Sequence, residues 1–129
     1  MEDYGTVVST IDSPSTRKFS FIIKKGSVRR GQFVELKTEE GRLIGRVSDI
    51  IKSNRYFERA ESVKEYESSG KDMGEIFPVS DWEYLVAEVA CLGVYNGKGF
   101  QDSLFPPSPG TKVMEPEGKL LQDFFGIDT

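Results

Sequence analysis

The chain has 129 residues, of which 37% are hydrophobic and 29% charged, and its formal net charge is -4. This length and composition are typical of one globular domain with its own core, and they exclude a wholly disordered chain. The single cysteine and the lack of histidine exclude an internal disulfide, a cysteine metal cage and imidazole-based catalysis.

The first half of the sequence predicts short strands separated by glycine turns. Aromatic and β-branched residues dominate Thr6 to Ser9 and Phe19 to Ile23, as expected for strands. After the glycines at positions 26 and 31, a further strand is predicted from Gln32 to Lys37. Val34 and Leu36 would then share one face of that strand, because side chains alternate along it.

A hairpin is predicted next, with a turn at Glu39 and Glu40 and with Gly41 in a left-handed position. The carboxylates of this turn are expected to be solvated, as charged side chains seldom lie buried without a partner. The returning strand is predicted from Arg42 to Ile51. Gly45 lies inside it, and an interior glycine indicates a bulge or sharp bend that lets a small sheet curl into a barrel.

The hydrophobic period changes after this strand. Phe57, Ala60 and Val63 recur at helical spacing. We therefore expect an inserted helix over about residues 54–70, with Asn54 as its cap and Gly70 as its end.

The same inserted segment interleaves aromatic and basic residues. Arg55, Tyr56 and Arg59 are candidates for a partner or subunit interface, since tyrosine and arginine are enriched at interface hot spots. Base stacking is a second reading of this pattern. Simple packing of Phe57 beneath the helix is the alternative, and the sequence alone leaves these readings open.

The second half predicts more strands. A strand from Trp82 to Leu92 places Ala87, Val89 and Cys91 on one face. Asn96-Gly97 is a strong signal for a type I′ hairpin turn.

The last elements are short. A strand is predicted from Thr111 to Met114 after the rigid, proline-rich run at residues 105–110. Pro116 suits the first turn of a C-terminal helix over about residues 117–125, which Gly126 ends. The fold class is therefore mainly β: a small closed β-barrel with an inserted helix and a short C-terminal helix, forming a single domain over residues 1–129.

Catalytic chemistry is not indicated. No segment has the pattern of a glycine, four residues, then Gly-Lys-Ser or Gly-Lys-Thr that cradles a phosphate, so we expect no ATP hydrolysis by this chain. Cys91 alternates with Val89 and Ala87, which favours a small core side chain over a reactive thiol. We expect no catalytic residue, no metal and no cofactor. Without a leader sequence or a long apolar stretch, a cytoplasmic location with no membrane contact is expected.

Four cations flank the turn at residue 26. Lys24, Lys25, Arg29 and Arg30 are candidate DNA contacts, because a cationic rim binds phosphates. The alternative is ordinary solvent-exposed charge at a turn. The net charge of -4 opposes strong binding to nucleic acid.

The order of these motifs resembles the amino-terminal HAS-barrel domain of archaeal HerA-type hexameric DNA translocases, or helicases. The resemblance extends over nearly the whole chain and rests on five segments: residues 28–35 (VRRGQFVE), 43–47 (LIGRV), 54–63 (NRYFERAESV), 82–89 (WEYLVAEV) and 105–110 (FPPSPG).

The resemblance implies a non-catalytic collar. In HerA-type proteins the barrels form a ring on the hexamer, a RecA-type ATPase core follows each barrel, and the ring engages the NurA nuclease during DNA end resection in double-strand break repair. This sequence stops at Thr129, where such an ATPase core would begin, so we expect either an excised domain or a free-standing barrel. The alternative function is an independent small β-barrel that binds nucleic acid non-specifically through its basic rim.

Overall fold

The apolar positions of six strands point inward and enclose one core. The computed structural model describes residues 2–24, 28–54 and 83–126. The enclosing strands are β1 (Asp3–Val8), β2 (Lys18–Ile23), β3 (Phe33–Thr38), β4 (Gly41–Asn54), β5 (Glu83–Tyr95) and β7 (Lys112–Met114). The short strand β6 (Phe100–Gln101) and the helix α4 (Gly118–Phe125) complete the described elements.

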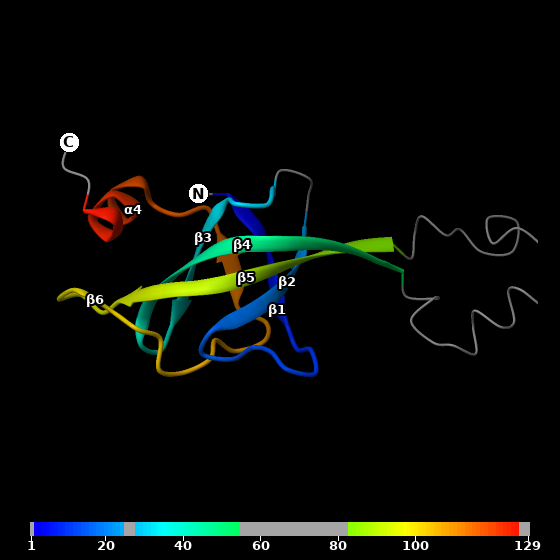
Figure 1. Cartoon of the computed structure of the whole chain (residues 1–129), viewed down its shortest axis with the longest axis horizontal. Coiled ribbons are helices and arrows are strands. Elements are labelled where there is room, and N and C mark those ends of the chain that lie inside the picture. The colour runs from blue at the N-terminus through cyan, green and yellow to red at the C-terminus, as the bar shows by residue number, and fades with distance from the viewer. Residues whose placement is uncertain (1, 25–27, 55–82, 127–129) are drawn as a thin grey trace, which may run out of the picture.

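Antiparallel pairing closes the sheet on itself. The strand order is β2-β1-β7-β3-β4-β5, and β2 also pairs with β5, which joins the two ends of this row (Figure 1). β6 pairs with β5 at the end of its hairpin. The predicted closed barrel with a short C-terminal helix is confirmed.

The barrel interior follows the alternation expected from the sequence. Val34 and Leu36 on β3 are buried, as are Ala87 and Val89 on β5, and Cys91 is half-buried against the same core. The largest fully buried side chains of this core come from every barrel strand: Phe19, Phe21, Leu36, Leu43, Val7, Val34, Val47, Val89, Val94 and Val113. Ile44 is also fully buried but is not part of the core cluster, and it pairs with Glu35.

The bend predicted at Gly45 is present. The β4–β5 register shifts between Ile44 and Gly45, where Leu92 is the additional residue on β5. A Cβ on Gly45 would collide with Val89 Cγ1 and lie 3.1 Å from Ala90 O. The two strands therefore approach closely here because residue 45 has no side chain.

β4 and β5 extend further at their C-terminal ends than the sequence predicts. β4 continues past Ile51 to Asn54, and β5 continues past Leu92 to Tyr95. Asn54, expected to cap a helix, is instead the last residue of β4 and pairs with Glu83. Cross-strand pairing between β4 and β5 extends both strands beyond the ends that the side-chain pattern alone indicates. The predicted inserted helix lies otherwise in residues 55–82, outside the described residues.

The hairpin after β5 forms, but its predicted turn type is wrong. Tyr95 pairs with Phe100, so residues 96–99 make the loop. Gly97 has a φ of 94°, whereas Asn96 has no positive φ, as a type I′ turn requires at both central positions. The Asn96 side chain instead accepts hydrogen bonds from the backbone N–H groups of Lys98 and Gly99, at 2.9 and 3.1 Å. This side-chain turn replaces the tight two-residue one.

The C-terminal helix begins slightly later than predicted. Glu117 is the N-cap of α4, so Pro116 lies before the helix and not in its first turn. Gly126 ends the helix as predicted, with a left-handed φ of 69° and with its N–H bonded to carbonyls of the last turn.

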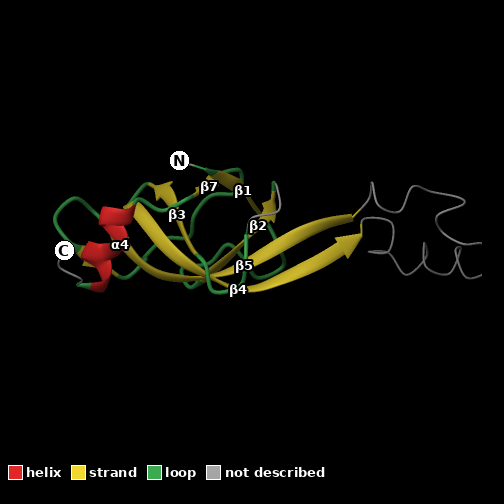
Figure 2. Ribbon diagram, turned by 90° about the horizontal axis from the view of Figure 1, so that it is seen from above, coloured by secondary structure: helices red, strands yellow, loops and turns green. Residues whose placement is uncertain are grey.

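β4 and β5 run side by side along the length of the molecule. Their far ends, Asn54 and Glu83, lie at one end, and α4 lies at the other (Figures 1 and 2). We call the part of this hairpin beyond the β2 pairing, residues 52–54 with 83–85, the arm.

Candidate partner-docking surfaces

The expected interface residues follow directly from the arm. Arg55, Tyr56 and Arg59 lie outside the described residues. The chain leaves β4 at Asn54 and enters β5 at Glu83, and these two residues are paired. The segment that carries the three interface candidates is therefore inserted at the arm, at the opposite end of the described structure from α4.

The expected DNA contacts lie in two settings. Lys24 follows β2, and its Nζ lies 3.4 Å from Asp3 Oδ2. Lys25 is outside the described residues. Arg29 lies in the turn before β3, where its backbone N–H donates to Gln32 Oε1 at 2.9 Å. Lys24 is thus held by a carboxylate, which reduces the positive charge that this part of the rim presents.

Arg30 belongs to a cationic cleft that the sequence reading did not identify. The cleft has a volume of about 360 Å³. Arg46 joins Arg30 in its wall, and Leu92, pushed outward by the β-bulge, supplies an apolar surface. Its lining residues are Arg30, Gly31, Arg46, Val47, Ser48, Ala90 and Leu92, and within the described part of the chain this lining contains no carboxylate.

Arg46 is fixed in place by two contacts. Its Nε donates to the Gly31 carbonyl at 3.2 Å, and its guanidinium lies 5.7 Å from the centre of the Phe33 ring. Such cation–π contact orients the arginine without neutralising its charge.

A second surface feature is a pair of exposed apolar side chains between β6 and β7. Leu104 is 70% exposed and Phe105 is 69% exposed. The Glu40 carboxylate accepts hydrogen bonds from both of their backbone N–H groups, at 2.8 to 3.1 Å. Pro106 and Pro107 then limit the backbone conformation. We call Leu104 and Phe105 the knob, since a fixed backbone presents both side chains to solvent.

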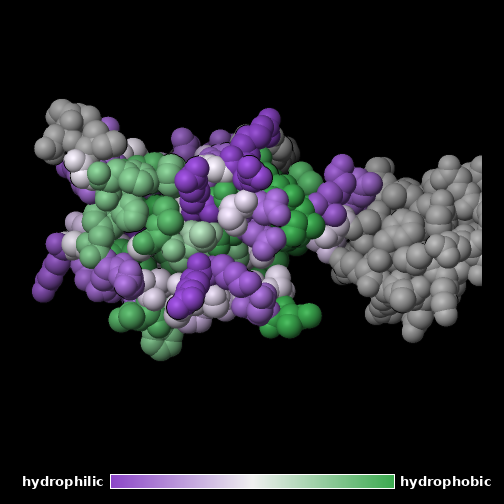
Figure 3. Space-filling model, viewed as in Figure 1, coloured by the Kyte–Doolittle hydropathy of each residue, from purple (hydrophilic) through white to green (hydrophobic). Residues whose placement is uncertain are grey.

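The hydropathy of the surface is uneven. On the face drawn in Figure 3, apolar surface gathers at the end where β6 and α4 lie, and further apolar atoms protrude at the lower edge. Hydrophilic surface separates these regions. Exposed apolar groups of this kind mark contact sites when they occur together.

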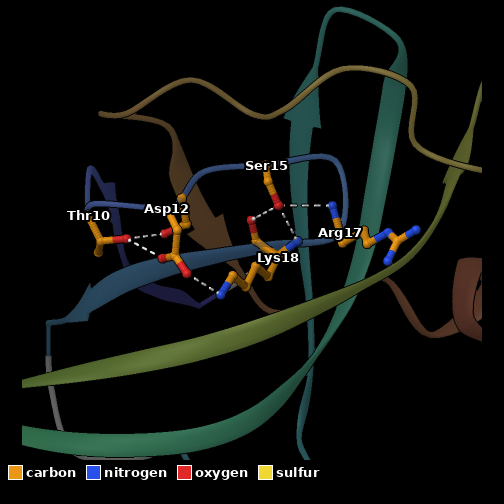
Figure 4. A network of polar contacts seen from close by, with 6 residues as sticks. Thr10, Asp12, Ser15, Arg17 and Lys18 are labelled. Carbon is orange, nitrogen blue, oxygen red and sulfur yellow. Dashed lines mark hydrogen bonds and ion pairs between the residues drawn. The ribbon is translucent and has the colours of Figure 1, made fainter.

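A groove of about 600 Å³ lies on the outer side of β2 and β5, under the loop that follows β1. Lys18 Nζ lies 2.6 Å from Asp12 Oδ2 at its rim, and Ser15 Oγ accepts from the N–H groups of Arg17 and Lys18 (Figure 4). The hydrogen bond and the charge of Lys18 lower the pKa of Asp12. Glu88 also lines the groove, so its carboxylates outnumber its one cation.

α4 is attached to the barrel through a buried carboxylate. The side chain of Glu35 is only 4% exposed. Arg42 contacts both of its oxygens, with Nε at 2.8 Å and Nη2 at 3.0 Å. Arg42 Nη2 also lies 2.7 Å from Glu117, whose backbone N–H donates to Glu35 Oε1 at 3.0 Å. The start of α4 is thereby fixed to the outer face of β3 and β4.

Aromatic rings complete this attachment. Phe33 on β3 packs edge to face on Phe125, and Phe124 packs in the same way on Phe100, each pair at 5.1 Å. Such aromatic pairs stabilise the contact beyond the effect of the apolar area that they bury. Gly93 leaves room beneath them, because a Cβ there would lie 3.3 Å from the Phe124 ring.

The described residues include many acidic side chains and one cysteine. Among them, no set of three His, Cys, Asp or Glu side chains is placed to hold a metal ion. Burial raises the pKa of the Cys91 thiol to about 11, which keeps it protonated near neutral pH.

Sequence reasoning missed the roles of Glu35 and Arg46, and it expected the Glu40 carboxylate to be solvated, whereas this group accepts hydrogen bonds from residues 104 and 105. Glu35 and Arg42 are recognisable in retrospect as a diagonal pair on one face of the β3–β4 hairpin. No local signal connects Glu40 to residues 104 and 105, since their contact depends on the closed barrel.

The comparison with known families gives one match. The family model described as HAS barrel domain matches residues 7–81, more than half of the chain. A search of curated proteins gave no match to this sequence. In the described ranges, none of the helical structure is long and apolar enough to span a bilayer.

Proposed function

Because the chain belongs to the HAS-barrel domain family, which is typical of HerA-type ATPases, we propose that it is the assembly and partner-docking barrel of a HerA-like hexameric DNA translocase. In this role it acts in DNA end resection and double-strand break repair without itself carrying out chemistry. The observation that carries the proposal is the family match, which spans β2, β3 and β4 and the last two residues of β1.

The arrangement of the barrel supports a mechanical role. The six-strand ring is closed, and α4 is attached by the Glu35–Arg42 pair and by aromatic contacts. The arm and α4 lie at opposite ends of the described structure (Figure 2). A rigid body with two separated attachment points suits a collar that links an ATPase core at one end to a partner at the other.

The partners in this proposal are neighbouring barrels in a hexameric ring, a HerA-type ATPase core and a NurA-type nuclease. Arg55, Tyr56 and Arg59 are proposed to contribute to the nuclease-facing or subunit-facing surface. DNA contact through Lys24, Lys25, Arg29 and Arg30 is proposed to be indirect or weak. ATP turnover belongs to the ATPase core, since this sequence has no phosphate-cradling loop.

Reconstitution tests the proposal. The full chain is mixed with a HerA-type ATPase core and with a NurA-type nuclease, and the products are measured by sedimentation and pull-down. We expect the chain alone to associate weakly, because stable interfaces usually bury about 1,200 to 2,000 Å² and one small barrel offers less to each neighbour. The ATPase core should supply the remaining contact and give a ring that captures the nuclease.

Two variants separate docking from folding. Tyr56→Ala combined with Arg59→Ala should weaken capture while leaving thermal unfolding nearly unchanged. Phe57→Ala should instead lower stability, by roughly 3 to 5 kcal/mol if that ring is fully buried. If neither the ATPase core nor the nuclease binds the intact chain, the proposed role is wrong.

A further inference from the structure

The knob is built to stay exposed. Leu104 and Phe105 are each more than two thirds exposed, yet the Glu40 carboxylate fixes both of their backbone N–H groups. A flexible loop would turn such side chains toward its own barrel. A fixed backbone prevents this and reduces the entropy lost when the two side chains are buried by another molecule.

The surroundings of the knob are acidic. Glu39 and Glu40 line its base, Asp102 precedes it in the chain, and Lys37 is the nearby cation. A receptor for the knob should therefore combine an apolar surface with positive charge.

The cationic cleft has these properties on the same barrel. Leu92 gives it an apolar wall and is 37% exposed, while Arg30 and Arg46 supply two positive charges. The larger groove is the weaker candidate, because Asp12 and Glu88 outnumber Lys18 there and would repel the acidic base of the knob.

The knob and the cleft are different surfaces of one molecule. The groove beside the knob is lined by residues 37–40, 105–108 and 111, and none of these lines the cleft. Two unlike surfaces that fit each other join copies head to tail, and head-to-tail contacts close into a ring when the rotation permits.

We propose that the knob of one barrel docks into the cationic cleft of a second copy of this chain. This inference rests on the proposed ring and names the contact between neighbours. An aromatic side chain buries only about 150 to 250 Å², so a single knob contact is weak by itself and depends on the rest of the assembly.

Disulfide trapping with two single variants tests the contact. Leu104→Cys marks the knob, and Ser48→Cys marks the exposed edge that the cleft shares with the larger groove, so the charge reversal at Arg30 described below assigns the contact to the cleft. The two full-length proteins are mixed under mild oxidation and separated on a non-reducing gel, with mass spectrometry to identify the linked residues. A specific contact raises the effective concentration of the two thiols, so the mixed disulfide should form at least about tenfold faster than either homodimer. The parent chain provides the background, since its Cys91 is half-buried and protonated near neutral pH.

Charge reversal gives an independent measurement. Arg30→Asp in the cleft variant should slow mixed-disulfide formation, and Asp102→Arg in the knob variant should restore it. Lys98→Asp makes the same charge change in the 96–99 loop and should have no effect. Phe105→Asp should also slow trapping, whereas Ile11→Asp alters a fully exposed apolar residue elsewhere and serves as its control.

The outcomes distinguish this contact from other possibilities. A dominant disulfide homodimer of the Leu104→Cys variant would mean a symmetric contact and would overturn the inference. Equal rates of disulfide formation for the mixed pair and the two homodimers would also overturn it. So would protection of the Leu104→Cys thiol from oxidation that appears only when nuclease is added. If the ATPase core still forms a nuclease-binding ring in those cases, the proposed function stands and only the knob-to-cleft contact fails.

Discussion

Glu35 shows how one residue connects barrel and helix. Its carboxylate is buried, contacts Arg42 through both oxygens and accepts the first N–H of the α4 cap. A buried carboxylate is stable only when its lone pairs are occupied, and the sequence places Arg42 and Glu117 to occupy them. Loss of this group would therefore affect α4 as well as the barrel.

Replacing Glu35 by glutamine should destabilise the protein measurably. The substitution keeps the side-chain volume but removes the charge that Arg42 contacts, so we expect a loss of about 1.5 to 3 kcal/mol in urea unfolding. Glu117→Gln is the control, because that side chain is 48% exposed, against 4% for Glu35, and surface ion pairs contribute about 0 to 1 kcal/mol. Equal losses in the two variants would contradict a special role for Glu35.

Cys91 should react slowly in the folded protein. Burial raises the pKa of its thiol to about 11 from the ordinary 9.0, so the reactive thiolate is scarce until the pH approaches the higher value. A group whose pKa is raised on folding favours the folded state below pH 9.0 and loses that contribution as the pH rises toward 11. The rate at which a thiol reagent modifies Cys91, measured against pH, should rise only as the pH approaches 11 in the folded protein. Unfolding in urea should shift this rise toward pH 9.0. A folded-state rise near pH 9.0 would contradict the expected burial.

At the scale of single elements, side-chain pattern identified most of what is seen. Alternation located the inward faces of β3 and β5, and Gly45 indicated the bend in β4. The pattern failed where long-range pairing or a local side chain decides the outcome. Pairing with Glu83 extends β4 to Asn54, and the Asn96 carboxamide selects a wider turn.

Gly45 should tolerate no side chain. In Gly45→Ala the new methyl group would meet Val89 and the Ala90 carbonyl, both on β5, so we expect a loss of about 1 to 3 kcal/mol from overpacking. Gly99→Ala is a suitable control, as nothing lies within 4 Å of a Cβ there. Equilibrium unfolding measures both, and a neutral Gly45→Ala would mean that the strands can separate at the bulge without cost.

On the scale of the whole molecule, family membership and barrel closure were predictable, whereas the surfaces were not. Closure brings Glu40 to the loop at residues 104–105, and the β3–β4 pairing places Arg46 in one cleft with Arg30. These residues are far apart in sequence, and no periodicity relates them. The knob and the cationic cleft therefore become visible only in the folded chain.

Binding of the intact chain to duplex DNA should be weak and independent of sequence. The net charge of -4 opposes the local attraction of Arg29, Arg30 and Arg46, and Lys24 is already paired with Asp3. Each phosphate contact contributes a log-log salt slope of about -0.9, so a few contacts leave little binding at physiological salt. Fluorescence anisotropy over a salt series measures this. Tight binding that persists at that salt would favour an independent nucleic-acid-binding barrel.

The pairing of Asn54 with Glu83 also has a consequence for the entropy of the unfolded chain. To form this pair, the chain must bring together the two ends of the segment at residues 55–82, and the entropic cost of such closure rises with the logarithm of the segment length. An Asn-Gly turn in place of residues 55–82 would join the same two strands with far less loss of freedom. The shortened chain should keep the barrel and unfold at higher urea, with a gain of roughly 2 kcal/mol from closure alone. Failure of the shortened chain to fold would mean that the barrel depends on this segment for more than connection.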